Sequence, residues 1–339
     1  MKAIRSLGTV AILCAAVLAA AAQSDSKNLI VTASNTSPNN VLVYDTSGRL
    51  LDTIATGGNG GVSGNAGGIA TAGNRVAVVN FASQNISVLR RTDAGLHLDQ
   101  VIPAASSPVS VAFGHGHLYI LGTTTIESHP TDHYAVAPGA DGLATLLKAD
   151  GSAAQVGVLE NQLIATEKSN TIETVNLAGD GAVSGAPSLV SNIPSNVNAP
   201  FGLITRDNQA YVTIAHANEI SLVRHDSVIT TTGSGTQSAP CWLALDGPWL
   251  FSANSPSMSL SRYLVYGSQI VQVVPVAASF NGAPTDIAYR SGWLAAIDGS
   301  GAVSHLSIFR VDWDGNLIRQ SQAIINAPAN GVVVIGDDD

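Results

Sequence analysis

The apolar positions of this chain form short segments, and turn residues separate one segment from the next. One stretch holds four of them, at residues 68–71, 76–79, 86–89 and 96–102, with turns such as Gly73-Asn74 between them. Segments of this length, with alternating or continuous apolar residues, are typical of β-strands. The stretch therefore predicts four antiparallel strands, which we call a, b, c and d in chain order.

A short phrase recurs at the start of each predicted strand a. It consists of a small residue, then Pro or Ala, two variable residues and an apolar run. The Pro or Ala stands at positions 66, 108, 153, 200, 240, 284 and 328, with gaps of 42, 45, 47, 40, 44 and 44 residues. Repeats of this length with four strands each are typical of propeller blades. Seven copies predict an all-β fold, a seven-bladed β-propeller of four-stranded antiparallel blades.

The two ends of the repeat region complement each other. Residues 28–54 hold three predicted strands with no strand a before them, whereas residues 330–335 form a strand of type a with nothing after it. We therefore expect the C-terminal strand to join the N-terminal blade and to close the ring. Closure removes the exposed strand edges that favour aggregation.

Residues 1–22 have the pattern of a secretory signal peptide. Lys2 and Arg5 precede an apolar stretch, and three Ala residues at positions 20–22 offer a cleavage site. The remaining 317 of the 339 residues, 23–339, are predicted to form one propeller domain that is secreted or periplasmic and monomeric. No second apolar stretch is long enough to predict a membrane span. Cys241 is the single cysteine of this part, so no intrachain disulfide is expected.

The charge balance excludes one class of partner. The chain has 15 basic and 24 acidic residues, and removing Lys2 and Arg5 leaves 13 against 24, a net charge of −11. The basic residues are scattered singly. Because no basic stripe is present to neutralise a phosphate backbone, we do not expect nucleic acid binding.

A polar residue stands near the end of predicted strand b in six of the blades. These residues are Asn35, Asn80, Glu167, His216, Asn254 and Asp298. In a propeller the b–c and d–a connections surround one mouth of the central channel, so we expect these side chains to meet there as a ligand-binding ring. Their oxygen atoms would suit Ca²⁺ or another divalent cation. The alternative is that Asn and Asp residues cap turns by bonding to nearby backbone.

Two further groups of residues are candidates. Residues 122–134 are predicted to be a long b–c loop that begins its polar part at Glu127, and His129, Asp132 and His133 within it could bind Zn²⁺ or simply be solvated. Asp286 lies near the start of a strand a, where a buried carboxylate with a raised pKa could act as a general base. Its alternative role is to bond neighbouring backbone or channel water. The sequence contains no nucleophile elbow and no phosphate-binding or dinucleotide-binding loop.

The repeat resembles a known family. The Ala-Pro phrase with its apolar run, the strand ending in Asn80 and the segment Ser-x-x-Ile-Ser-Val at 83–88 resemble secreted YVTN-type repeats and lactonase-like seven-bladed propellers. That family includes 6-phosphogluconolactonases and carboxymuconate cyclases. Residues 163–172 look like its strand-plus-Asn-Glu segment, with Glu167 retained. The resemblance covers the mature chain and implies lactone chemistry in the channel.

Two functions therefore stand as expectations. The first is a secreted module that binds a small molecule or a protein partner through the face carrying the b–c loops. The second is a lactone hydrolase in which His216 is the general base, Glu167 orients it or holds a metal, and Asp286 assists. The residues that follow the repeat Pro include no basic residue, so 6-phosphogluconolactone is not an expected substrate. They are Val109, Phe201, Cys241, Thr285 and Ala329.

Overall fold

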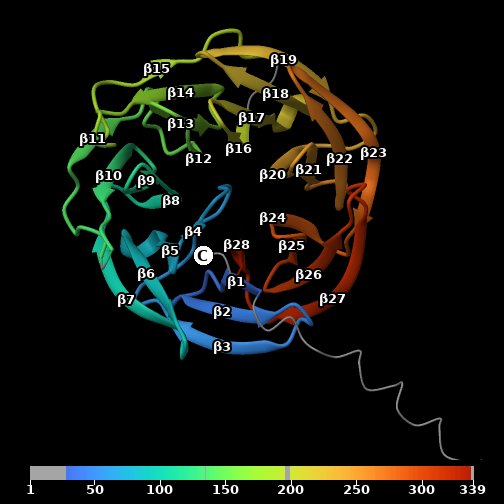
Figure 1. Ribbon diagram of the computed structural model, residues 1–339, viewed down its shortest axis with the longest axis horizontal. Coiled ribbons are helices and arrows are strands. Elements are labelled where there is room, and N and C mark those ends of the chain that lie inside the picture. Colours follow the sequence, from blue (N-terminus) through green and yellow to red (C-terminus); the bar gives the residue numbers. More distant parts are fainter. Residues whose placement is uncertain (1–27, 134, 195–198, 337–339) are drawn as a thin grey trace, which may run out of the picture.

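The computed structural model describes residues 28–133, 135–194 and 199–336, and these residues form a ring of seven blades around a central channel (Figure 1). Each blade is a four-stranded antiparallel sheet, as the repeat predicts. The predicted leader, residues 1–22, lies outside the described residues. Within the described ranges, no helix has the length and apolar character needed to cross a membrane.

The strands follow the order a to d from the channel outward. Strands a line the channel: β28 (Asn330–Ile335), β4 (Ile69–Ala72), β8 (Pro108–Gly114), β12 (Ala153–Val158), β16 (Pro200–Arg206), β20 (Pro240–Asp246) and β24 (Ala283–Arg290). Strands b are β1 (Leu29–Ala33), β5 (Arg75–Asn80), β9 (His117–Gly122), β13 (Gln162–Glu167), β17 (Gln209–Ile214), β21 (Trp249–Asn254) and β25 (Trp293–Ser300). Strands c are β2 (Asn40–Asp45), β6 (Asn85–Thr92), β10 (Thr125–Pro130), β14 (Thr171–Asn176), β18 (Glu219–Arg224), β22 (Ser259–Tyr266) and β26 (Val303–Val311). Strands d are β3 (Leu50–Ala55), β7 (Gly95–Pro103), β11 (Gly142–Thr145), β15 (Ser188–Leu189), β19 (Ser227–Gly233), β23 (Gln269–Ser279) and β27 (Leu317–Ile325).

The C-terminal strand closes the first blade, as predicted. That sheet has the order β28-β1-β2-β3, and β28 pairs with β1 from Leu29 opposite Ile335 to Ala33 opposite Asn330. The Thr32 hydroxyl adds a bond of 2.7 Å to the carbonyl oxygen of Gly331. Residues 299 positions apart are thus joined, so the two ends of the chain hold the ring shut.

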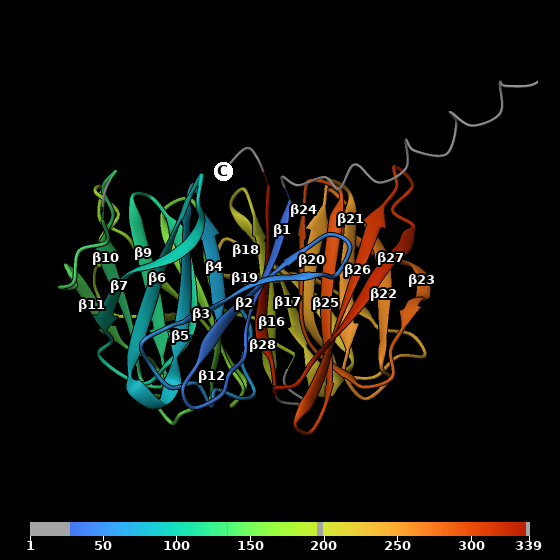
Figure 2. The ribbon, with the colours of Figure 1, turned by 90° about the horizontal axis from the view of Figure 1, so that it is seen from below.

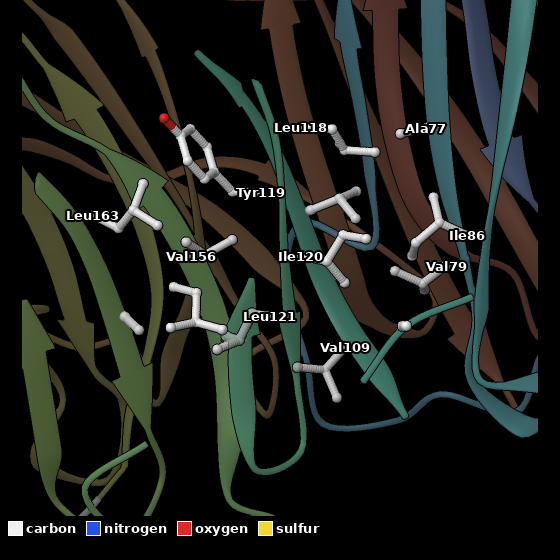
Figure 3. Close-up of a cluster of buried hydrophobic side chains, with 14 of the residues drawn as sticks. Ala77, Val79, Ile86, Val109, Leu118, Tyr119, Ile120, Leu121, Val156 and Leu163 are labelled. Carbon is white, nitrogen blue, oxygen red and sulfur yellow. The ribbon is translucent and has the colours of Figure 1, made fainter. Parts of the chain in front are cut away.

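The core lies between neighbouring blades. Figure 3 shows Val79 and Ile86 of one blade close to Ile120 of the next, with Val156 of a third on the far side. Both faces of the inner strands are covered, so the stretch from Leu118 to Leu121 is buried at 0–1% exposure. This explains why inner strands have continuous apolar runs rather than alternating ones. The outer strands d have one solvent face, and the pattern of β7 accordingly mixes buried and exposed residues.

The prediction of a long b–c loop at residues 122–134 is wrong. Strand c of this blade, β10, begins at Thr125, so the b–c connection is only residues 123 and 124. Glu127 and His129 lie inside this strand, and their side chains are buried between elements. His129 Nδ1 donates to the carbonyl oxygen of Ala137 at 2.9 Å. The sequence does not show an apolar strand pattern here because buried polar residues such as Glu127 and His129 bond to neighbouring loops.

The two faces of the ring carry different connections. The b–c and d–a connections lie on one face, and the a–b and c–d turns lie on the other, which is the upper face in Figure 2, where β28 ends. The long c–d connection after β10 therefore lies on the same face as the His115 turn. There His117 Nε2 lies 2.9 Å from a carboxylate oxygen of Asp141.

Candidate functional site in the central channel

The loop between β3 and β4, residues 56–68, enters the channel at the face of the b–c connections. We call it the plug. In Figure 1 the segment that precedes β4 reaches toward the centre of the ring. Val62, Asn65 and Ala66 in this loop are 4%, 0% and 2% exposed. The sequence predicts only a flexible connection here because of its glycines, so the plug was missed.

The plug bonds to blades all around the ring. Asn65 Nδ2 donates to the carbonyl oxygen of Val109 at 2.7 Å, and Asn65 Oδ1 accepts from Asn330 Nδ2 at 3.1 Å. The carbonyl oxygen of Asn65 accepts from Trp242 Nε1 at 3.1 Å, across 177 positions of sequence. The backbone N–H of Ala66 donates to the carbonyl oxygen of Ala154. The loop therefore closes this end of the channel with bonds to four different blades.

Close approach explains one glycine of the plug. Gly67 has φ of +63°, and a Cβ atom there would lie 2.9 Å from Ser110 Oγ and 3.1 Å from Gln155 Nε2. Its carbonyl oxygen accepts from both the Val111 N–H and the Ser110 hydroxyl. Only glycine combines this left-handed backbone with such tight contacts.

Asn80 and Asn254, two members of the predicted ring, are structural. Both are 0% exposed. Asn80 Oδ1 accepts from Asn39 and Thr56, and its Nδ2 donates to Asn85 and Ser87. Asn254 is bonded to serines in the same way, at Ser252, Ser259 and Ser261. Since these amides are fully engaged within their own and the adjoining blade, they do not turn toward a ligand.

Asn35 also supports the backbone. Its Oδ1 accepts from the N–H groups of Gly61 and Val62 at 2.7 and 2.9 Å, and its Nδ2 donates to the carbonyl oxygen of Val62. It therefore holds the plug at its first blade.

Glu167 occupies the equivalent position in blade 4 and is 0% exposed. Pairing with the first residue of strand a establishes the equivalence, because Ala153 faces Glu167 as Pro240 faces Asn254. Glu167 Oε2 accepts from the Lys148 N–H at 3.3 Å, while Oε1 has no partner. Burial raises the pKa of this carboxyl, and the nearby charge of Asp150 adds to the effect.

Glu173 is a second buried carboxyl beside Glu167, and sequence reasoning missed it. It is 0% exposed, its Oε2 accepts from the Leu147 N–H at 2.8 Å, and its Oε1 is unpaired. Burial raises the pKa of Glu173 to about 7, and the charge of Glu167 contributes in the same direction. Strand register could have identified it, because Glu173 stands where Ser87 and Ser261 stand in other blades.

Asp298 lies at the same position in blade 7, facing Pro284. It is 0% exposed, and its Oδ2 accepts from the Gly282 N–H at 2.9 Å. Burial raises the pKa of Asp298, although His305 at 3.4 Å opposes that shift.

His216 does not belong to this ring. The residue that faces Pro200 in its blade is Ile214, and His216 lies two positions later in the 3₁₀ turn η2 (Ala215–Ala217). Its side chain is exposed. Among the described residues no hydrogen bond joins His216 to Glu167. The expected base and its orienting carboxylate are therefore not brought together.

Few oxygen atoms of the predicted ring remain available to a divalent cation. The oxygens of Asn35, Asn80 and Asn254 are occupied by N–H and O–H donors, and the free oxygens of Glu167 and Asp298 belong to blades 4 and 7. In the part of the chain that the structure describes, no three His, Cys, Asp or Glu side chains gather as metal ligands.

Among the predicted residues, Asp286 lines a cavity inside the channel, and Asn35 lines a second pocket at the channel mouth. Beneath the plug lies a space of about 170 Å³, bounded by Gly67 and by strands a of six blades, with Asp286, Gln155, Trp242 and Tyr289 among the lining residues. Asp286 Oδ1 accepts from the Ile287 N–H at 2.9 Å, and Oδ2 accepts from the Val332 N–H at 3.0 Å. Burial raises its pKa to about 7 despite these two bonds.

The bond from Asp286 to the next blade has counterparts. Ser110 Oγ accepts from the Val156 N–H at 3.3 Å, and Gln155 Oε1 accepts from the Leu203 N–H at 2.6 Å. Each of these channel side chains joins its own strand a to that of the following blade. A hydroxyl or an amide fills this structural role without charge, so joining the blades does not by itself require a carboxylate at 286.

A second pocket, of about 290 Å³, lies at the channel mouth beside the plug, and we call it the mouth pocket. Its lining includes Phe201, Trp242, Ser63, Thr285 and Asn330. The rings of Phe201 and Trp242 meet edge to face, with centroids 5.3 Å apart.

Lys168 stands near this pocket, and the sequence reasoning did not single it out. Its Nζ donates to the carbonyl oxygens of Gly64 at 2.6 Å and Ala153 at 3.1 Å and lies 6.0 Å from the Phe201 ring centroid. Desolvation lowers the pKa of Lys168. Its position directly after Glu167, at the end of strand b, was the available signal.

Comparisons with known proteins agree on the architecture. No family model matches the chain, and no curated protein matches it. Among solved structures, a Bacteroides uniformis protein named provisionally as a 6-phosphogluconolactonase is similar, with 15% identity, a TM-score of 0.69, and coverage of 91% of this chain and 100% of that one. A periplasmic gluconolactonase from Pseudomonas aeruginosa has 14% identity and a TM-score of 0.68, covering 91% and 99%.

A third similar structure comes from Bacteroides fragilis and is also named provisionally as a 6-phosphogluconolactonase. It has 14% identity and a TM-score of 0.64, covering 92% of this chain and 98% of that one. Identities this low carry the fold and not the activity. The chain therefore has the fold of the lactonase-like seven-bladed β-propellers.

Proposed function

We propose that this protein is a lactone hydrolase whose general base is Asp286 in the central channel. The observation that carries the proposal is a single buried carboxyl in a closed-ring cavity, with its pKa raised to about 7. A general base works best when its pKa lies near the working pH. The similarity to structures named as lactonases supports the reaction class.

The reaction needs only water and the ester. The Asp286 carboxylate takes a proton from a water molecule as the water oxygen attacks the lactone carbonyl carbon. The resulting tetrahedral species breaks its ring C–O bond, and the ring oxygen leaves with the proton that Asp286 returns. The product is an open-chain hydroxy acid. The two backbone N–H bonds to Asp286 fix its orientation while leaving lone pairs for the water.

The test is the Asp286→Asn variant assayed against a panel of lactones. Loss of a general base reduces turnover by about 10²–10⁴-fold. Because the amide turns an NH₂ group toward one backbone N–H, the variant also loses about 1–3 kcal/mol of stability, so the assays stay well below its melting temperature. The matched controls are His216→Ala and Glu167→Gln, which keep full turnover.

The pH profile gives an independent measurement. Wild-type kcat/KM rises with pH through about 7, because the carboxylate is the active form. A chelator leaves the rate unchanged. Full activity in Asp286→Asn, or loss of activity in folded His216→Ala, contradicts the proposal.

A second candidate is ligand capture without chemistry in the mouth pocket. It is favoured by the Phe201–Trp242 pair and by a lining that contains hydroxyl and amide groups but neither carboxylate nor imidazole. Saturable binding of a ligand that Ser63→Trp removes, in a protein that opens no lactone, would establish this function instead.

A further inference from the structure

The two ends of the channel differ in solvent access. Several strands a become more exposed from the b–c face toward the a–b turns. The burial of β8 and of β16 each runs from four buried residues to three partly exposed ones. In β20 and β24 the final residues are likewise partly exposed. Water therefore reaches the channel from the face of the a–b turns.

The plug accounts for this difference. Asn65 and Gly67 close the other end through bonds to Val109, Trp242, Asn330 and Val111. Each such bond contributes on the order of 1 kcal/mol, so displacing the loop would require breaking several at once. Trp242 lines both the mouth pocket and the inner cavity, and its indole N–H is held by the plug. It is thus a wall between the two spaces.

Most of the side chains that line the inner cavity are apolar. Of its fourteen lining residues, only Gln155, Trp242, Asp286 and Tyr289 have polar side-chain atoms. Three of these have one polar atom engaged, since Gln155 Oε1 accepts from the Leu203 N–H, Trp242 Nε1 donates to Asn65, and the Tyr289 hydroxyl accepts from the Gly292 N–H. A sugar lactone has more hydroxyl groups than the Gln155 amide NH₂ and the Asp286 carboxylate can pair, and each buried hydroxyl left without a partner costs about 1–3 kcal/mol.

The volume limits the ligand as well. A cavity of about 150 Å³ is sufficient for one benzene ring, and this cavity measures about 170 Å³. We propose that the substrate of the Asp286 site is an uncharged, alkyl-bearing lactone of about one six-membered ring, and that it enters from the face of the a–b turns. This inference rests on the proposed function and specifies its substrate class and its route.

The substrate class and the route of entry are tested separately. Lactams serve as ligands because they resist hydrolysis, so binding can be measured without turnover. Calorimetry measures the binding of 6-methyl-2-piperidone and of glucono-δ-lactam to the wild type. We expect the alkyl lactam to bind at least tenfold more tightly. Tighter binding of glucono-δ-lactam overturns the substrate class.

The route is tested by closing each end with a large side chain. Ala288 and Ile204 line the cavity and are partly exposed, toward the a–b turns, whereas Ser63 is an exposed residue of the plug outside the cavity. Ala288→Trp and Ile204→Trp each weaken binding of 6-methyl-2-piperidone more than tenfold, and Ser63→Trp leaves it unchanged. Two blocking variants are used, with melting curves, so that misfolding of one does not decide the result. The reverse pattern overturns the route.

The proposed function and this inference fail in different ways. If 6-methyl-2-piperidone binds as expected but δ-lactones with a methyl group are not hydrolysed, the hydrolase proposal fails and the site assignment stands. If gluconolactone is hydrolysed in an Asp286-dependent manner while the alkyl lactam does not bind, the hydrolase proposal stands and this inference fails.

Discussion

Single positions in equivalent blades show which polar residues have a role beyond folding. In blade 2 the Asn80 amide and the Ser87 hydroxyl support the preceding d–a connection without charge. In blade 4 the same positions hold Glu167 and Glu173, which accept from the N–H groups of 148 and 147. Two adjacent buried carboxyls with raised pKa values are a less stable solution than an amide with a hydroxyl. They make the stability of this blade depend on pH.

We expect Glu173→Gln to flatten that dependence. The pKa of Glu173 is raised from 4.5 to about 7, so between these values the unfolded chain loses the proton while the folded chain keeps it. Because the folded state binds more protons, the free energy of unfolding falls as pH rises from about 4.5 to 7. Urea unfolding of wild type and variant across this range measures the difference, since all other titrating groups are shared. Parallel curves would show that Glu173 is ionised in the fold.

Asn80→Ala tests the structural role of the buried amides. The change removes one hydrogen bond each from the Asn39 amide, the Thr56 hydroxyl and the Asn85 and Ser87 side chains, and all four lie in or beside the buried interior. We expect a loss of about 1–3 kcal/mol in the free energy of unfolding, measured in urea. His216→Ala, an exposed residue in a 3₁₀ turn, is the control and stays within about 0.5 kcal/mol. If both variants changed the free energy of unfolding equally, the buried amide of Asn80 would have no special structural role.

At the scale of elements, each blade depends on strand pairing, and the first blade depends on strands from both ends of the chain. β28 contributes the whole inner edge of this blade, and its Val332 N–H is also the partner of Asp286. Closure of the ring and the geometry of the candidate site thus share one strand.

A chain that ends at Pro328 should lose both the closure of the ring and the geometry of the Asp286 site. Without β28, the inner edge of β1 has unpaired N–H and C=O groups, which favour association with other chains. We expect aggregation or failure to fold, measured by light scattering after size-exclusion chromatography. A chain ending at Gly336 is the control and should remain folded. A monodisperse truncated protein with an unchanged melting temperature would show that closure contributes nothing.

The repeat predicted these elements because each blade has the same local pattern of apolar runs and turns. The Pro of the repeat begins β8, β16 and β20, as the phrase indicates. The candidate site was less predictable for two reasons. Equivalence in spacing does not say whether a side chain faces the channel or its own blade, as Asn80 shows. The plug bonds to residues far away in sequence, and its glycines look like a flexible connection.

At the scale of the whole molecule, the ring forms a channel with one closed and one open end. The plug, which connects blade 1 to blade 2, makes the closed end by bonding to residues of blades 1, 3, 4 and 6. Such a loop ties opposite sides of the ring together, which neighbouring-blade contacts cannot do. It also fixes Trp242 as the wall above Asp286, so the stability of the ring and the chemistry of the cavity are linked.

Asn65→Ala tests this link. The substitution removes the bonds from the Asn65 side chain to the buried carbonyl oxygen of Val109 and to the half-buried amide of Asn330. We expect a loss of about 1–3 kcal/mol in the free energy of unfolding. We also expect faster hydrogen exchange at the Ala66 and Val111 N–H groups, because the first donates from the plug to Ala154 and the second donates to Gly67 of the plug. Asn59→Ala, an exposed position in the same loop, is the matched control and should change neither quantity. If exchange at Ala66 and Val111 stays as slow in Asn65→Ala as in the control, the backbone bonds alone hold the plug and the Asn65 side chain does not close the channel.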